Sequence, residues 1–109
     1  MDKVIEAAEN LAAEYKNSAA YKEYARLKKI IEKDPGLKSA VDSFYKASEA
    51  HEIKRMNGGT IPFDDERIMS NKYTELWLNE TGHKFMAAKK ELKAALVRIY
   101  GIIETNCDI

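Results

Sequence analysis

The sequence SAAYKEYARLKKIIEKDPGLKSAVDSFYKASEAHEIKRMNGGTIPF, residues 18–63 of the chain, decides the fold. Its apolar residues recur at intervals of three and four, which is the period of a helix with one buried side. Asp34-Pro35-Gly36 divides the stretch, and Asn57-Gly58-Gly59-Thr60 follows its second half. We therefore predict two amphipathic helices, whose apolar sides must pack against each other or against another chain.

Local signals indicate where these two helices begin and end. Ser18 is a suitable N-cap for the first of them, which we expect to end near Lys33. The side chain of Asp34 can accept hydrogen bonds from backbone N–H groups in the first turn of the second helix. Pro35, at the first position of that helix, has no N–H that would need a partner. Gly58 can adopt the left-handed conformation that ends many helices.

Three more helical segments complete the chain. We predict one over about residues 2–15, one opening at 62–66 with three carboxylates at its positive end, and a long final helix over about 83–105 after a break at 79–82. The predicted buried side of the fourth helix consists of Ile68, Met69, Tyr73, Leu76 and Trp77. The aromatic residues predicted to lie in the core are Tyr15, Tyr21, Tyr24, Phe44, Tyr73, Trp77 and Phe85. The expected fold is all-α: antiparallel helical hairpins in a small bundle of four to five helices, forming a single domain over residues 1–109.

The final helix has an unusually wide apolar side. At about 100° per residue, its apolar residues between 85 and 103 cover an arc of roughly 160°. Such an arc fits contact with a second subunit, or a central helix wrapped by the other four within one monomer. We favour a homodimer. Its candidate interface residues are Leu92, Ala95, Leu96, Ile99, Ile102 and Ile103.

The overall charge gives no sign of a nucleic-acid or membrane partner. The chain has 18 basic and 18 acidic residues and a formal net charge of +0. No apolar run is long enough to span a bilayer, and the single cysteine excludes an internal disulfide, so we expect a cytoplasmic protein. The final helix has a local excess of basic residues, namely Lys84, Lys89, Lys90, Lys93 and Arg98. We do not expect direct nucleic-acid binding, but a basic face for RNA is the alternative function.

No motif for catalysis, a metal or a cofactor is complete. Glu80 and His83 have the spacing of a di-iron helical bundle, but such a site needs a second pair and two further glutamates. His51 continues an apolar stripe, which is typical of a structural or interfacial histidine. Cys107 alone cannot hold a cluster, although a cluster shared between chains remains open. We therefore expect no enzyme activity.

Several stretches resemble the YlbF/YmcA family of small helical regulators, including its YheA-like branch. They are residues 17–18, residues 21–28 (YKEYARLK), Asp34-Pro35, the helix of Phe44, residues 59–61 with the acidic residues after them, Phe85-Met86-x-Ala88, Leu92, and the apolar helix from Leu96 to Ile103. The likeness covers nearly the whole chain through patterning rather than through an invariant motif.

The resemblance implies an all-α dimer without catalytic activity, from a Gram-positive bacterium. Relatives assist competence, sporulation and biofilm formation, as partners in a complex that adjusts messenger-RNA processing by an endoribonuclease. A heteromeric complex with related regulators and an endoribonuclease is therefore the implied setting. Two positions depart from the family: Lys89 stands where members often have an acidic residue, and only Cys107 could serve a shared iron–sulfur cluster.

Overall fold

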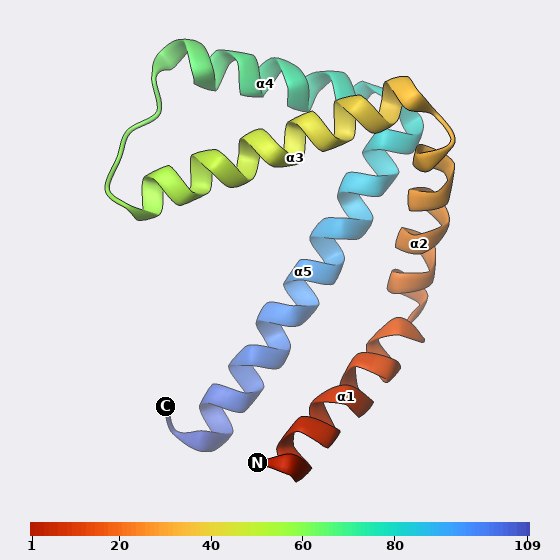
Figure 1. The fold of residues 1–109 in the computed structure, drawn as a ribbon, viewed down its shortest axis with the longest axis vertical. Coiled ribbons are helices and arrows are strands. Elements are labelled where there is room, and N and C mark those ends of the chain that lie inside the picture. Colours follow the sequence, from red (N-terminus) through yellow and green to blue (C-terminus); the bar gives the residue numbers. More distant parts are fainter. The chain divides into compact units, whose positions relative to one another are not determined.

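The computed structural model describes residues 1–109, and the protein is all-α (Figure 1). Its helices are α1 (Asp2–Lys16), α2 (Ala19–Glu32), α3 (Pro35–Met56), α4 (Phe63–Leu78) and α5 (Glu80–Cys107). There are five helices and no strand, which confirms the predicted fold class. None of the five helices combines the length and the apolar character needed to cross a membrane.

The predicted starts of α2 and α3 are confirmed by their caps. The hydroxyl of Ser18 accepts a hydrogen bond of 3.2 Å from the backbone N–H of Tyr21. The carboxylate of Asp34 accepts one of 3.1 Å from the N–H of Leu37. Each bond satisfies an amide that has no partner within its own helix.

The end of α3 also follows the local signal. Gly58 has φ of 81°, which glycine adopts without the steric cost other residues bear. Its N–H donates to the carbonyl of Arg55 at 3.0 Å, and the N–H of Gly59 donates to that of Lys54 at 2.9 Å. These two bonds form a Schellman motif, which ends the helix and turns the chain toward α4.

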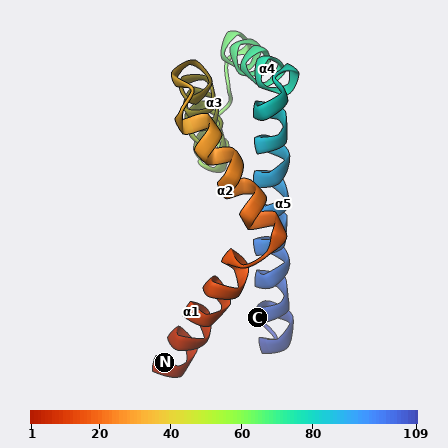
Figure 2. The same cartoon turned by 90° about the vertical axis from the view of Figure 1, so that its right-hand side faces the viewer.

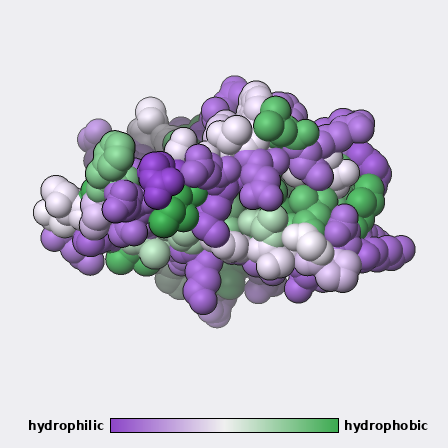
Figure 3. Space-filling model, turned by 90° about the horizontal axis from the view of Figure 1, so that it is seen from above, coloured by the Kyte–Doolittle hydropathy of each residue, from purple (hydrophilic) through white to green (hydrophobic).

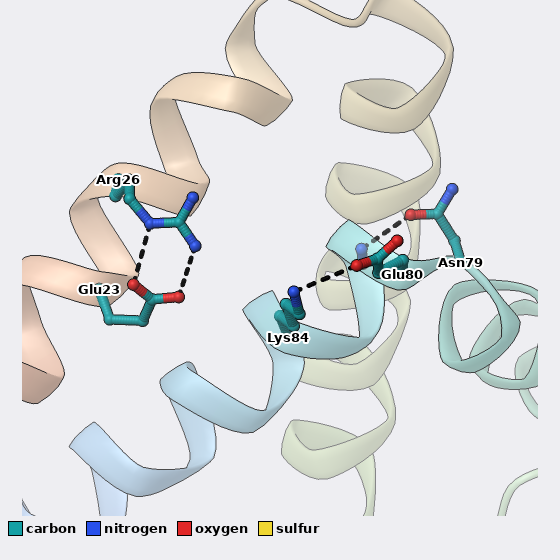
Figure 4. Close-up of polar contacts among 6 residues, drawn as sticks. Glu23, Arg26, Asn79, Glu80 and Lys84 are labelled. Carbon is teal, nitrogen blue, oxygen red and sulfur yellow. Dashed lines mark hydrogen bonds and ion pairs between the residues drawn. The ribbon is translucent and has the colours of Figure 1, made fainter.

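The predicted start of the final helix is wrong by three residues, because α5 begins at Glu80 rather than His83. Figure 4 shows the side chain of Asn79, whose oxygen accepts a 2.8 Å hydrogen bond from the N–H of Gly82. Asn79 therefore caps α5, and Gly82 lies inside its first turn instead of breaking the chain. The helix also continues to Cys107, two residues beyond the predicted end.

The packing divides the chain into two compact units, which are described separately. Unit 1 comprises residues 1–28 and 85–109, and unit 2 comprises residues 29–84. The boundaries fall inside α2 and inside α5. The expectation of a single domain stays a prediction.

Unit 1 contains α1, most of α2 and the long C-terminal part of α5. Figure 1 shows α1 and this part of α5 running in opposite directions, and Figure 2 shows that they diverge toward the two chain ends. The buried residues of this unit are Leu27, Phe85, Met86, Ala88 and Leu92. None of them comes from α1.

Unit 2 is built around the antiparallel hairpin of α3 and α4 (Figure 1). Its buried apolar residues are Ile31, Val41, Phe44 and Leu76. The predicted buried side of α4 is largely wrong, because Ile68, Tyr73 and Trp77 are 46%, 45% and 49% exposed. The hairpin therefore leaves about half of each of these side chains exposed in the single chain.

The chain as a whole leaves much apolar surface uncovered. Nine hydrophobic residues are buried, whereas 18 large hydrophobic residues are exposed. Figure 3 shows hydrophobic side chains lying between hydrophilic ones on the face that it draws. The predicted aromatic core is correspondingly reduced to Phe44 and Phe85, since the other five aromatic residues are part-buried or exposed.

Candidate interaction surface

Tyr15 joins α1 to α5 within unit 1. Its hydroxyl donates a hydrogen bond of 2.8 Å to the carbonyl oxygen of Leu92. Burial raises the pKa of the Tyr15 phenol, and the neighbouring Tyr21 and Tyr24 raise it further. A neutral phenol is the form that can donate this bond, so the surroundings favour the contact.

A row of aromatic rings extends from this contact across the unit. Ring centroids are 6.0 Å apart for Tyr15 and Tyr21, and 6.0 Å apart for Tyr21 and Tyr24. Tyr24 then stacks on the buried ring of Phe85, with centroids 5.2 Å apart. Contacts of this kind each stabilise by about 0.5–1.5 kcal/mol beyond the area they bury. The row therefore fixes the C-terminal end of α1 against α2 and α5.

Beyond Tyr15, the two helices leave an apolar groove of about 220 Å³ between them. Its residues are Ala8, Leu11, Ala12 and Tyr15 from α1, and Leu96 and Ile99 from α5. The two alanines leave space that larger side chains would fill. Every residue along this groove is apolar apart from the tyrosine hydroxyl, which already bonds to Leu92.

Exposed apolar side chains continue from the groove toward both chain ends. We call the following set the apolar face of unit 1: Val4, Ile5 and Leu11 of α1, and Leu96, Tyr100, Ile102 and Ile103 of α5. Their exposed fractions range from 43% for Leu11 to 69% for Tyr100. Exposed apolar side chains gathered in this number are typical of interaction sites in soluble proteins.

The structure divides the six predicted interface residues into three groups. Leu92 is only 7% exposed and belongs to the core of its own unit. Ala95 and Ile99 are part-buried. The remaining three are about half exposed, namely Leu96, Ile102 and Ile103. The interface stays a prediction. The structure also shows exposed apolar residues on α1, Val4 and Ile5, which the sequence analysis did not include. Their helical spacing indicates an apolar side of α1 but not that this side is uncovered.

The predicted basic residues do not form a narrow stripe. Lys84 lies in unit 2, where it makes an ion pair of 3.2 Å with Glu80 (Figure 4). The four in unit 1 are Lys89, Lys90, Lys93 and Arg98, and helix geometry spreads them over about 180° of α5. A phosphate backbone that follows one line of positive charge would not contact all four together.

Unit 2 has a separate open groove between α3 and α4, of about 380 Å³. Phe44, His51 and Tyr73 lie along it. An ion pair of 3.0 Å between Arg55 and Glu66 crosses its rim. His51 is thus part-buried in a hairpin groove, in agreement with a structural or interfacial histidine.

The Glu80 and His83 pair has neighbours of another kind. Glu80 contacts Lys84, whereas the ring of His83 lies edge-on to Trp77 with centroids 3.9 Å apart. The Nδ1 atom of His83 is 3.2 Å from the carbonyl oxygen of Trp77. The structure gathers no group of three or more histidine, cysteine or acidic side chains that could hold a metal. Cys107 is exposed.

Comparison with known proteins agrees with this helical architecture. The model of the family described as "Control of competence regulator ComK, YlbF/YmcA" matches residues 4–107. The chain belongs to the YlbF/YmcA family. The resemblance inferred from the sequence is therefore confirmed.

Two curated relatives and one solved structure match this chain over nearly their full lengths. The chain is 29% identical to a UPF0342 protein of Caldicellulosiruptor bescii over 108 residues, which are 99% of this chain and 91% of the relative. A UPF0342 protein of Caldicellulosiruptor saccharolyticus is also 29% identical, covering 100% of this chain and 91% of that protein. Among solved structures, Bacillus subtilis RicA in complex with RicF superposes with a TM-score of 0.64 at 25% identity, covering 97% of this chain and 94% of that one.

Proposed function

We propose that this YlbF/YmcA-family chain is a non-catalytic regulator that acts through contacts between its helices and other proteins. The observation that carries the proposal is the apolar face of unit 1, which α1 and α5 present together. Family membership supports a regulatory role, because the family is described as controlling a competence regulator. The partners we expect are a second copy of this chain or related regulators.

The finer parts of the proposal rest on the family. The RicA structure superposed on this chain was solved in complex with RicF, which supports a heteromeric assembly of related helical subunits. We propose that this chain likewise works in the cytoplasm of a Gram-positive bacterium, in a complex that adjusts messenger-RNA processing by an endoribonuclease. Its working parts would be helix surfaces rather than a catalytic pocket.

Light scattering of the full chain at micromolar concentration, alone and mixed with purified related regulators, tests the proposal. We expect a mass above that of the monomer in at least one of these samples. Leu96→Glu would bury a carboxylate without a partner in any such interface, which costs several kcal/mol, roughly. The matched control is Lys90→Glu, which lies on the opposite side of α5 and should leave the mass unchanged. A monomer in every mixture, or an assembly that Leu96→Glu does not alter, contradicts the proposal.

A further inference from the structure

We propose that Asn57 is a site of spontaneous deamidation, and that it reacts only while the turn at the end of α3 is open. The inference goes beyond the proposed function and does not depend on it. It is carried by three observations: the dipeptide Asn57-Gly58, the exposure of the Asn57 side chain, and the hydrogen bonds that close the turn.

The reaction takes place between an asparagine and the residue after it. The backbone nitrogen of Gly58 attacks the side-chain Cγ of Asn57, so that an N–C bond forms and the Cγ–Nδ2 bond breaks. Ammonia leaves with the proton of the attacking nitrogen. Water then opens the five-membered imide and leaves aspartate or isoaspartate. Glycine favours the attack because it has no Cβ to crowd its nitrogen.

Asn57 is the one asparagine of the chain that precedes a glycine. The asparagines at positions 10, 17, 71, 79 and 106 are followed by leucine, serine, lysine, glutamate and cysteine. The Asn57 side chain is exposed and makes no hydrogen bond within the chain. By contrast, the side chain of Asn79 caps α5, and that of Asn106 donates a 2.7 Å hydrogen bond to the carbonyl of Ile102. The chain therefore contains its own slow-reacting reference sites.

The closed turn keeps the Gly58 nitrogen from this reaction. Its N–H donates to the carbonyl of Arg55 at 3.0 Å, so the proton that must leave is engaged. Closing a five-membered ring also requires this nitrogen to be nearly eclipsed with the Cβ of Asn57. The ψ angle of Asn57 is 13°, which places the two atoms well away from that arrangement. The backbone at Asn57 must therefore rotate before the attack.

The turn can open without the rest of unit 2. Two backbone hydrogen bonds close it, from Gly58 to the carbonyl of Arg55 and from Gly59 to that of Lys54 at 2.9 Å. All residues from 52 to 58 are exposed, so no buried side chain holds this end of α3 in place. Helix ends of this kind open far more readily than a core. We therefore expect opening of the turn, rather than unfolding of the unit, to limit the reaction.

The modification would be felt on α4 through Arg55. Its carbonyl accepts the Gly58 bond, and its side chain makes the 3.0 Å ion pair with Glu66 on the rim of the hairpin groove. Isoaspartate lengthens the main chain by one methylene group at the turn, and either product adds a carboxylate at the negative end of the α3 dipole. Both changes loosen the turn that positions Arg55.

The test follows the full chain during incubation near neutral pH by peptide mapping with mass spectrometry. Aspartate and isoaspartate are counted at each asparagine, in buffer and in urea that unfolds the chain. Asn57 should react first in both samples. In the folded chain it should react on the order of tenfold more slowly than in the unfolded one, because two backbone hydrogen bonds must break. This ratio of rates is the protection of the site.

Two variants locate the opening that controls the rate. A Cβ on Gly59 would be 3.0 Å from the carbonyl oxygen of Lys54, which accepts the second bond of the turn. Gly59→Ala should therefore lower the protection about fivefold, the factor that corresponds to one lost backbone hydrogen bond. Val41→Ala is the control, because Val41 is buried in unit 2 and remote from the turn. It should raise the unfolded fraction on the order of tenfold and leave the protection unchanged.

Hydrogen exchange gives a second measurement that needs no variant. Deamidation and exchange of the Gly58 amide both require its N–H to leave the carbonyl of Arg55, so their protection should agree to within about threefold. Agreement, together with the response to Gly59→Ala, supports the inference. Equal rates in the folded and unfolded chain, or an intact Asn57 in a folded chain whose Gly58 amide exchanges, overturns it. A loss of protection in Val41→Ala also overturns it, since unfolding of the whole unit would then set the rate. The proposed function is unaffected by any of these results.

Discussion

Two glycines of the same helix should respond to alanine in opposite directions. Gly101 lies in α5 with no atom within 4 Å of the position that a Cβ would take. Gly82 lies in the first turn of α5, where a Cβ would be 3.0 Å from the carbonyl oxygen of Leu76 and 3.4 Å from the side-chain oxygen of Asn79. Both glycines therefore lie within the same α-helix, but only Gly101 has room around it for a Cβ atom.

The size of the effect follows from two opposing terms. Alanine in place of glycine stabilises a helix by about 0.5–1 kcal/mol, because the unfolded chain loses freedom. At Gly82 the Cβ would also press on a carbonyl that already accepts a 3.1 Å hydrogen bond from the N–H of Asn79. Overpacking of this kind costs about 1–3 kcal/mol. We expect Gly101→Ala to raise the free energy of unfolding by up to about 1 kcal/mol and Gly82→Ala to lower it by about 1 kcal/mol.

Urea unfolding followed by circular dichroism at equal protein concentrations measures this difference. With a slope of about 1–3 kcal/mol per molar, the midpoints of the two variants should differ by about 1 M. Gly82→Ser extends the series, because it adds the same Cβ and should also be destabilising. If Gly82→Ala stabilised the protein as much as Gly101→Ala, the close packing of α5 on the last turn of α4 would be refuted.

Three further outcomes are expected. Tyr15→Phe removes the hydrogen bond to the carbonyl of Leu92 and should lower the free energy of unfolding by about 1 kcal/mol at neutral pH. Because the folded-state pKa of Tyr15 is raised, its phenol stabilises the wild type below about pH 10, and this effect is lost as the pH rises through that pKa. Urea unfolding across this pH range should show the free energy of unfolding declining less steeply in Tyr15→Phe than in the wild type. Parallel declines in the two proteins would contradict the assignment. Asp34→Ala should lower the free energy of unfolding by about 1 kcal/mol, and Asp34→Asn should lower it much less, since asparagine also caps helices. Equal losses in the two variants would contradict the role of Asp34 as the cap of α3. Titration with single-stranded RNA at two salt concentrations should reveal no binding, whereas affinity falling steeply with salt would favour the basic residues of α5 as an RNA site.

The ends of most helices could be predicted because their signals are local. Ser18, Asp34 and Gly58 act through hydrogen bonds or dihedral angles within four residues of themselves, so the sequence alone contains the information. The start of α5 is the exception. In the sequence, a glycine at this position indicates a break between helices. Gly82 is instead buried against α4, where there is little room for a side chain, and only the packing of the two helices shows this.

Burial could not be predicted to the same extent. Periodicity states which residues share one side of a helix, not whether another element covers that side. Leu27 and Val4 both lie on regular apolar stripes, yet they are 2% and 58% exposed. The difference arises because α2 packs closely in its unit, whereas α1 contacts α5 through Tyr15 and then diverges from it (Figure 2).

The candidate interface illustrates the same limit at the scale of one helical turn. Leu92 and Leu96 are four residues apart on the same stripe of α5, and the sequence assigns both to an interface. Leu92 lies beside the Tyr15 contact and is 7% exposed, whereas Leu96 lies where the groove opens and is 50% exposed. The point at which α5 changes from core helix to exposed helix is therefore set by where the aromatic row ends on α1. Extending that row by one turn, with Leu11→Tyr, should bury more of Leu96 within the chain and weaken any assembly that needs it. An unchanged dissociation constant for a folded Leu11→Tyr variant would place the interface away from this groove.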